Sequence, residues 1–470
     1  MADPVEELLA IGKGIVVIEK SSGVTPVIAV NYAHAIGATV LLVEPLKTGE
    51  EKEIQYFLAK SQNSFPDSNI LLEEIVNSRV GNVNFNLYSY GTFFTSGVPY
   101  STVLRNVIPF SHVHLHLKMD FFLFNGIFYE LGSAVNSAIV FSPGFFKESE
   151  ETVPVGTSIT NHRYFLRQLL NEEATAHNLD MHVKEYPFDL LHICSHGGDV
   201  AGEYCSLRLI DAEGETHTLE FDVVISFYPA NYYQVAPRHT KFFWRVYNGH
   251  PWNSPEFWKA GGIDGDLFAR FRQIGEEKIE AGLLKGTQVK NVPNSACVVC
   301  YDFPFLGMID AVAAARVFPF VFNNSCWSGF EMAEAFIDAG TRAYIGTLWN
   351  VDNEVATEVG KAFYDTVFDL GIAKALYIAS RKTDGTRSDQ IYIFWGLHFS
   401  TLKTGQDIGK SKENVIHYLG SSHKWLIDNA RNHPNNSVRQ YSLAKAMWIR
   451  RYMEENFIED MFRMKSEGLL

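Results

Sequence analysis

Cysteine, positive charge and long apolar runs are scarce in this chain, and each scarcity excludes a class of protein. Five cysteines in 470 residues do not make the paired framework of a small secreted domain. A net charge of -14 argues against general binding to nucleic acid or to anionic membranes. Because no run of eighteen or more apolar residues occurs, we expect no transmembrane helix.

Targeting and phosphate-binding motifs are absent too. The first residues lack a basic segment followed by a long apolar one, so we predict no signal peptide. The odd number of cysteines then fits a reducing cytoplasm. Neither G-x-G-x-x-G nor G-x-x-x-x-G-K-[ST] is present, so no nucleotide phosphate loop is predicted. We expect no organic cofactor and no metal.

The chain is rich in what builds large cores. It is 46% hydrophobic, with 35 Phe and 21 Tyr, and its length suggests two or three domains. A strand, a helix and a second strand are predicted between residues 13 and 44, which is typical of a parallel sheet. We interpret the aromatic-rich residues 84–135 as further strands. A second α/β series begins near residue 134.

The pattern of apolar residues also predicts elements in the rest of the chain. In the second series we expect a helix over 161–177 and a short strand over 181–185. An amphipathic helix is expected earlier, over 50–61. Residues 228–305 interrupt the α/β pattern with prolines and aromatics, and we treat them as an insertion. From residue 412 onward the pattern indicates helices with a break at Pro434.

Two short motifs carry the chemistry. An apolar run over 188–194 ends at Ser195-His196-Gly197-Gly198, and another over 317–322 ends at Asn323-Asn324-Ser325-Cys326-Trp327-Ser328-Gly329. Ligands of open parallel sheets bind outside the carboxyl ends of the strands. His196 and Cys326 can therefore project into one crevice, which is the arrangement that a thiol protease needs.

The residues around this pair suit acyl transfer. Cysteine attacks carbonyls as its thiolate, so it needs a base, and His196 can supply one. Cys326 precedes a helix expected from about residue 330, whose N-terminus favours negative charge. We predict the amides of Gly197 and Cys326 as the oxyanion hole, where one donor is worth about 2.7–4 kcal/mol.

The segments stand in an order that resembles the CHAT family of caspase-like cysteine peptidases. After the cysteine motif come EMAEAFIDAGTRAYIGTLWNVDNEVATEVGKAFYDTVF, AKALYIASRK and IYIFWGLHFSTL, and upstream lies His192-x-x-x-His196-Gly197. The resemblance covers about residues 130–402. It implies a caspase-like three-layer αβα sandwich with a mostly parallel sheet.

The resemblance also implies a domain plan. The peptidase domain would span 134–405 and carry the insertion 228–305. Residues 1–133 would form an N-terminal α/β region, either a degenerate caspase-like half or a sensor. A helical segment, 406–470, would follow.

The function implied is that of a cysteine endopeptidase acting on a protein substrate, with His196 and Cys326 as its catalytic dyad. Members of this family are usually bacterial or archaeal, and many act in antiviral defence or cell suicide when a partner protein or signal ligand releases them. Two alternatives stay open: a catalytically silent caspase-like scaffold, and a cysteine acyl transferase or amidase on the same fold.

Two departures from related enzymes bear on specificity and control. Caspase histidines lie about 50 residues before the cysteine, whereas His196 and Cys326 are 130 positions apart. The insertion 228–305 must therefore emerge beside the site, where it is a candidate gate or substrate-docking element. Metacaspases and legumain-like enzymes carry an aspartate two residues before the cysteine, and this chain has Asn324. The caspase Q-A-C-x-G is absent as well, so the residue preferred at P1 stays open.

Three further residues are candidates for the substrate cleft: His192, Asn324 and Trp349. His192 shares a strand face with His196, and we interpret it as structural support. Trp349 follows an expected strand and is equally compatible with a core position. Asp352 and Glu354 are expected to cap the next helix.

Two sets of residues have metal-like spacing. Cys297 and Cys300 are two residues apart, but no second pair accompanies them. His112, His114 and His116 alternate along an expected strand and so share one face. We interpret the cysteines as core residues and the histidines as a polar strand face.

Overall fold

The structure is a computed structural model, which describes residues 13–21, 24–46, 54, 65–115, 119–146, 151–230, 235–252, 254–284, 286–293, 295–315, 317–382 and 391–469. Apart from Ile54, the helix expected over 50–61 lies outside the described residues, as does His116.

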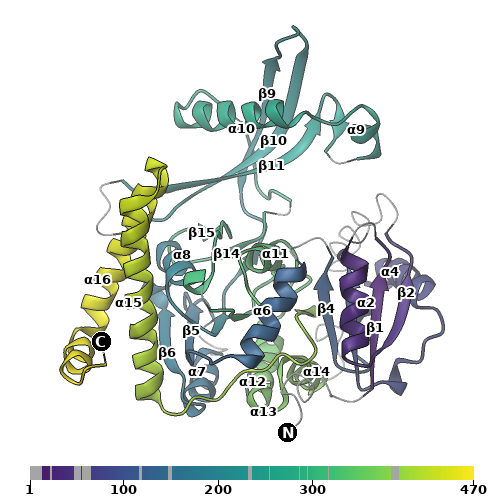
Figure 1. Cartoon of the computed structure of the whole chain (residues 1–470). Coiled ribbons are helices and arrows are strands. Elements are labelled where there is room, and N and C mark those ends of the chain that lie inside the picture. Colours follow the sequence, from purple (N-terminus) through teal and green to yellow (C-terminus); the bar gives the residue numbers. More distant parts are fainter. Residues whose placement is uncertain are drawn as a thin grey trace.

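A large sheet forms the centre of the molecule (Figure 1). Its ten strands are, in spatial order, β2 (Thr39–Val43), β1 (Gly14–Glu19), β3 (Tyr90–Thr95), β4 (Phe110–His114), β18 (Tyr392–Trp395), β17 (Ala343–Thr347), β16 (Phe320–Asn323), β7 (Leu190–Ile193), β5 (Ser137–Ser142) and β6 (Phe165–Leu170). All neighbouring pairs are parallel except β17 and β18. The predicted α/β class with a mostly parallel sheet is therefore confirmed.

Both faces of this sheet are covered. Every residue of β1, β3, β5, β7, β16, β17 and β18 is buried. Successive side chains of a strand point to opposite faces, so burial of all of them requires a layer on each side. The helices that accompany the sheet are α2 (Thr25–Ala35), α4 (Phe65–Val80), α5 (Tyr100–Val103), α6 (Met119–Leu131), α7 (Thr152–Asn161), α8 (Ala176–Glu185), α11 (Glu331–Asp338), α12 (Asn353–Tyr364), α13 (Val367–Leu370) and α14 (Ile372–Lys382).

The N-terminal strands and the strands that carry the two motifs belong to the same sheet. The junction is the pair β4 and β18, where His112 lies opposite Trp395. His112 is completely buried there, and its Nδ1 lies 3.2 Å from the carbonyl oxygen of Phe394. The region predicted as 1–133 therefore shares a sheet and a core with the rest of the chain.

A second sheet projects away from the first, at the top of Figure 1. It contains β12 (His250–Pro251), β11 (Arg238–Tyr247), β10 (Thr216–Phe227), β9 (Gly202–Ile210) and β13 (Thr287–Val289), and it carries α9 (Pro255–Lys259) and α10 (Gly265–Glu280). Because β10 pairs with β11, this projecting sheet includes residues on both sides of the boundary predicted at residue 228.

Two predicted elements of the second α/β series are wrong. Residues 152–161 form α7, and the segment expected to continue as a helix to 177 instead forms β6. A short apolar run such as FLRQLL fits a helix or a buried strand equally well, and pairing with β5 decides it. The strand expected over 181–185 lies inside α8, which begins after Thr175 and its side-chain cap on Asn178.

The aromatic-rich region is also only partly β. It supplies β3 and β4, but its last part is the helix α6 rather than a strand. The expectation of strands throughout 84–135 was wrong there, because aromatic content favours strands without excluding a helix that packs on a sheet.

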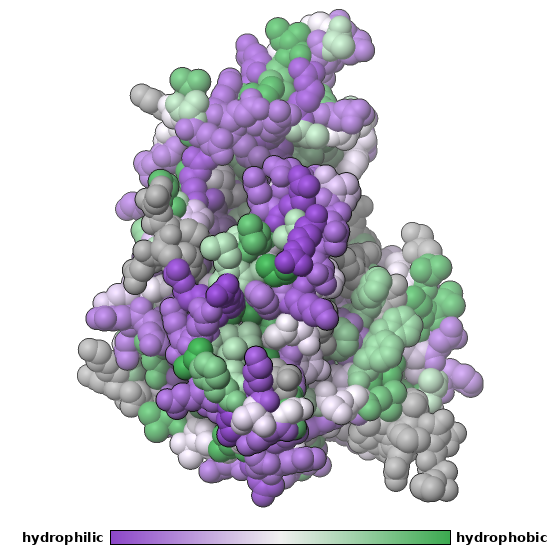
Figure 2. All heavy atoms as spheres, turned by 60° about the vertical axis from the view of Figure 1, so that its left-hand side comes forward, coloured by the Kyte–Doolittle hydropathy of each residue, from purple (hydrophilic) through white to green (hydrophobic). Residues whose placement is uncertain are grey.

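The chain closes with a helical hairpin, as predicted: α15 (Ile408–Asn432) and α16 (Asn436–Ser466). Asn435 caps α16 by accepting hydrogen bonds from two amides of its first turn. Figure 2 brings this side of the molecule forward and shows a mostly hydrophilic face with hydrophobic patches between. No helix among the described residues is long and apolar enough to cross a membrane.

Candidate active site

The two motifs leave neighbouring parallel strands at the same edge of the large sheet. Leu190 lies opposite Phe320 and Ile193 opposite Asn323. The amide of Asn324 then donates to the carbonyl of Ile193 over 2.8 Å. This register brings the residues that follow β7 beside those that follow β16, as the strand-end argument predicted.

His196 and Cys326 line one small cavity. Its other lining residues come from the ends of β5, β7 and β16 and from the start of α12: Phe146, Glu151, Cys194, Ser195, Asn324, Val351, Asn353, Ala356 and Thr357. The cavity measures about 20 Å³, which is room for about one water molecule. The structure thus places the two predicted dyad residues at one site.

Gly197 makes this arrangement possible. A Cβ atom at this position would lie 2.3 Å from the carbonyl oxygen of Cys326 and 2.7 Å from Ser325 Oγ, so no other residue fits without moving the cysteine loop. The loop of His196 and the loop of Cys326 are therefore in direct backbone contact.

The same register orients the Gly197 amide. Residues 197–198 form the short strand β8 (Gly197–Gly198), which pairs with β14 (Cys297–Val299) so that Gly197 lies opposite Val298. The amide of Val299 donates to the carbonyl of His196. Since hydrogen-bonded and non-bonded pairs alternate along an antiparallel ladder, the Gly197 amide points away from β14. It is free of that ladder, as an oxyanion donor has to be.

The loop that carries Cys326 is held rigidly. Thr347 Oγ1 donates to the carbonyl of Ser325 over 2.7 Å, Tyr344 donates to that of Ser328 over 2.8 Å, and Trp395 Nε1 donates to that of Gly329 over 2.8 Å. Trp327 adopts a left-handed backbone with φ of 59°, a strained conformation for a non-glycine residue that surrounding contacts must maintain. Such a loop fixes its cysteine without support from a ligand.

Cys326 sits in a partly buried position at the mouth of this loop. Its Sγ accepts from the amide of Val351 over 3.4 Å and lies 3.9 Å from the carbonyl oxygen of the same residue. Burial raises the pKa of the Cys326 thiol, and the contact with Val351 lowers it in part. The resting cysteine is therefore a thiol that needs a base before it can attack.

His196 is exposed and lies under aromatic cover. Its ring is 4.6 Å from that of Phe146, edge to face, and 5.4 Å from that of Phe145, stacked. Phe146 also lines the cavity. The two phenylalanines follow β5 and thus tie the position of the histidine to the next strand of the sheet.

A buried carboxylate, Glu151, lies in the cavity wall and escaped the sequence analysis. It precedes α7 and is only 2% exposed. Its Oε1 accepts from Asn324 Nδ2 over 2.6 Å and lies 3.1 Å from His192 Nε2. Burial, together with the nearby Glu151, raises the pKa of the Cys194 thiol well above its usual range. The signal that could have found Glu151 is its place after β5, whose carboxyl end meets that of β7.

The three predicted cleft residues separate. Asn324 lines the cavity, and its amide is fully engaged, because Nδ2 donates to Glu151 and to Ala356 while Oδ1 accepts from Tyr392 over 2.6 Å. His192 is completely buried behind the cavity, against Glu151 and Tyr364, which agrees with a supporting role. Trp349 is 7% exposed and is not among the lining residues. The expected cap by Asp352 is present, since its side chain accepts from the amide of Glu354.

The two sets of residues with metal-like spacing do not form a metal site in the part of the chain that the structure describes. No group of three or more His, Cys, Asp or Glu side chains is arranged there to hold an ion. Cys297 and Cys300 are free and buried, and burial raises the pKa of the Cys297 thiol to about 12. Both fit the interpretation as core residues.

Comparisons with known proteins give a distant structural likeness only. Neither a protein-family model nor a curated protein matches the sequence. The fold is similar to that of the Arg-specific cysteine proteinase gingipain R, with 9% identity, a TM-score of 0.40 and coverage of 86% of this chain and 80% of that one. It is also similar to the complex of the RgpB pro- and mature domains from Porphyromonas gingivalis, with 11% identity, a TM-score of 0.39 and coverage of 84% and 80%. Likenesses as distant as these assign no function.

Proposed function

We propose that this protein is a cysteine endopeptidase in which Cys326 is the nucleophile and His196 the general base. The observation that carries the proposal is the cavity that both residues line, at the carboxyl ends of two neighbouring parallel strands. The resemblance to CHAT peptidases noted in the sequence supports the same pair of residues.

The proposed reaction is a two-step acyl transfer. His196 accepts the thiol proton, and Cys326 Sγ attacks the carbonyl carbon of the scissile peptide. The amides of Gly197 and Cys326 stabilise the oxyanion. His196 then protonates the leaving amine, and water, activated by the same imidazole, hydrolyses the thioester. The reaction needs no cofactor.

We further propose that the enzyme has a low basal activity that a partner protein or a signal ligand raises, as in the antiviral defence and cell-death pathways of the CHAT family. The cavity beside the dyad has room for about one water molecule, and we propose that the site widens when the activating partner or ligand binds. The projecting sheet is the candidate gate, because its strand β9 begins at Gly202, only a few residues after His196 and the two glycines. We propose that the substrate is a protein and that cleavage takes place in the cytoplasm.

Cleavage profiling on a peptide library tests the proposal. The full chain is expected to release peptides with a defined P1 preference, and Cys326→Ala is expected to release none. Cys194→Ala is the matched control, because Cys194 lines the same cavity with a thiol of strongly raised pKa and should not be needed. Equal cleavage by Cys326→Ala would refute the assignment.

The closed cavity also favours one alternative, a catalytically silent scaffold on the same fold. A silent protein would show no peptidase activity with any partner and no reaction of Cys326 with a peptidyl electrophile. An acyl transferase would instead consume a second substrate, which product analysis by mass spectrometry would detect.

A further inference from the structure

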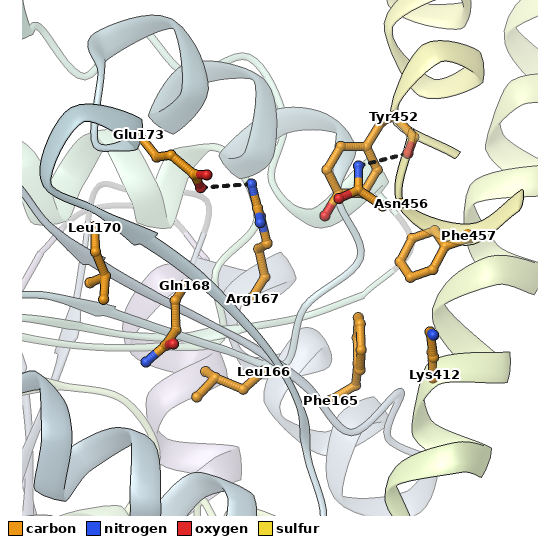
Figure 3. Close-up of a pocket in the computed structure, with 10 residues that line it drawn as sticks. All are labelled: Phe165, Leu166, Arg167, Gln168, Leu170, Glu173, Lys412, Tyr452, Asn456 and Phe457. Carbon is orange, nitrogen blue, oxygen red and sulfur yellow. Dashed lines mark hydrogen bonds and ion pairs between the residues drawn. The ribbon is translucent and has the colours of Figure 1, made fainter. Parts of the chain in front are cut away.

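A second hollow lies at the far edge of the large sheet, along β6, and β5 separates β6 from β7, the strand that leads to His196 (Figure 3). It measures about 490 Å³. One wall comes from β6 and the residues after it, and the other from the C-terminal hairpin of α15 and α16. The lining residues are Phe165, Leu166, Arg167, Gln168, Leu170, Glu173, Lys412, Tyr452, Asn456 and Phe457.

β6 is the last strand of the sheet, and its outer side has main-chain groups without partners in the sheet. Among the residues that the structure describes, it pairs only with β5, in parallel, with Ser137 opposite Phe165 and Ser142 opposite Leu170. The amide of Phe165 donates to the carbonyl of Asn136 over 2.8 Å. Because main-chain groups of successive residues point to opposite sides of a strand, the alternate residues Leu166, Gln168 and Leu170 direct theirs outward.

The hollow follows this outer edge. Side chains of alternate residues lie on opposite faces of a sheet, yet Phe165 and Arg167 from one face and Leu166 and Gln168 from the other all line the same hollow. A hollow that touches both faces of β6 must run along the outer edge of this strand. A further strand of the sheet would lie at this edge, about 4.8 Å from β6.

The hairpin of α15 and α16 faces the outer edge of β6, so the hollow between them is a slot. At one end, the rings of Phe165 and Phe457 are 5.7 Å apart, and the Lys412 ammonium lies over both. Lys412 also pairs with Asp460 of α16. Farther along, Arg167 pairs with Glu173 over 3.1 Å, on the side of Tyr452. Both cations are thus neutralised, and the slot offers aromatic walls, apolar side chains and unpaired peptide groups.

We propose that this slot binds an extended segment of a partner polypeptide, which joins the sheet as an eleventh strand beside β6. Exposed strand edges recruit strands through main-chain hydrogen bonds, while pockets for alternate side chains give specificity. The aromatic wall of Tyr452 and Phe457 supplies such a surface.

The arrangement of the elements excludes a second copy of this chain as the occupant. Figure 1 shows the hairpin of α15 and α16 beside β6, beyond the edge of the sheet, and Lys412 of α15 contacts Phe165. A neighbouring sheet from another copy would have to stand where the hairpin stands. A single extended chain needs only the space between β6 and the hairpin.

The test uses the full chain and an array of synthetic capped hexapeptides, with the strongest binder resynthesised for solution measurements. Gln168→Pro removes one outward amide without touching the ladder to β5, and we expect it to weaken binding about tenfold. Gln168→Ala, which keeps the amide, should bind within about twofold of the natural chain. N-methylation of alternate peptide amides should abolish binding in one phase and leave it intact in the other.

The N-methylation pattern is measured on the natural chain, so it decides the question even if Gln168→Pro fails to fold. Absence of binding by every array peptide, equal binding by Gln168→Pro and the natural chain, or loss of binding with both N-methylation phases would overturn the proposal. All measurements use the full chain, because the hairpin of α15 and α16 forms one wall of the slot.

Discussion

Gly197 is the residue at which the two candidate catalytic loops meet, because only a hydrogen atom fits between its Cα and the main chain of Cys326. Gly197→Ala should therefore push the two loops apart and move the Gly197 amide away from the oxyanion, and we predict a loss of about 100-fold in kcat/KM on the best library peptide. Gly420→Ala is the control, since no atom lies within 4 Å of a Cβ added there. That variant should stay active and gain up to about 1 kcal/mol of stability. Full activity of Gly197→Ala would contradict the proposed contact.

Glu151 organises the polar floor of the cavity. Its carboxylate accepts from the buried amide of Asn324 and faces His192. Glu151→Ala removes one of the two acceptors of Asn324 Nδ2 and the carboxylate beside His192, and we expect the free energy of unfolding to fall by about 2 kcal/mol. Glu151→Gln keeps an oxygen of the same reach and should cost clearly less. Urea denaturation of the two variants checks this; equal losses would show that the carboxylate oxygen is not the important acceptor.

The thiol of Cys326 should titrate late. Burial raises its pKa, so between neutral pH and the usual pKa of cysteine it stays mostly protonated. The rate of alkylation by iodoacetamide should therefore rise with pH and level off only above the usual range for a free cysteine. Val351→Pro removes the amide that donates to Sγ and should move the midpoint still higher, whereas Val351→Ala should not. A midpoint below the usual range would contradict the thiol form described here.

At the scale of the elements, the sequence was informative wherever a strand is buried on both faces. Continuous apolar runs led correctly to β7 and β16, and hence to a shared site for His196 and Cys326. The same reasoning failed for β6, because its FLRQLL run also fits a helix and only its pairing with β5 settles the choice. Glu151 was missed for a related reason: its role depends on the order of β5 and β7 in space, which no local pattern encodes.

Hydrogen exchange can check the outer edge of β6 directly. The amide of Phe165 is bonded to Asn136, and those of Arg167 and Leu169 face the same way. The amides of Leu166, Gln168 and Leu170 face outward. We predict an alternating pattern in the free protein, with slow exchange at the first set and fast exchange at the second. Uniform protection along β6 would show that the edge is already covered.

At the scale of the whole molecule, buried histidines should make the fold sensitive to acid. Burial lowers the pKa of His112 to about 4 and those of His182 and His398 to about 3. The unfolded chain takes up these protons near pH 6.5 and the folded chain does not. The free energy of unfolding should therefore fall as the pH drops from about 6.5 toward 4, with His112 alone contributing about 3 kcal/mol.

Urea denaturation at several pH values measures this effect, and the range from pH 6.5 to 5 largely avoids titrating ordinary carboxylates. His112→Gln carries no titrating group and should show a smaller slope against pH. A slope for His112→Gln equal to that of the natural chain would contradict the neutral, buried state of His112.

One sheet joins the whole molecule. Its ten strands run from the N-terminal region, past the strands that position Cys326 and His196, to the open edge at β6. Since β5 lies between β6 and β7 and leads to Phe146 beside His196, a strand added at the edge would be only two strands from the candidate active site.

The central claim is that Cys326, with His196, is a nucleophile for peptide substrates, and covalent labelling tests it most directly. The full chain would be treated with a set of peptidyl acyloxymethyl ketones and examined by intact and peptide-level mass spectrometry. The account predicts one adduct, on Cys326, that persists in Cys194→Ala and disappears in Cys326→Ala and His196→Ala. An adduct that forms equally in Cys326→Ala, or that maps to another cysteine, would contradict it.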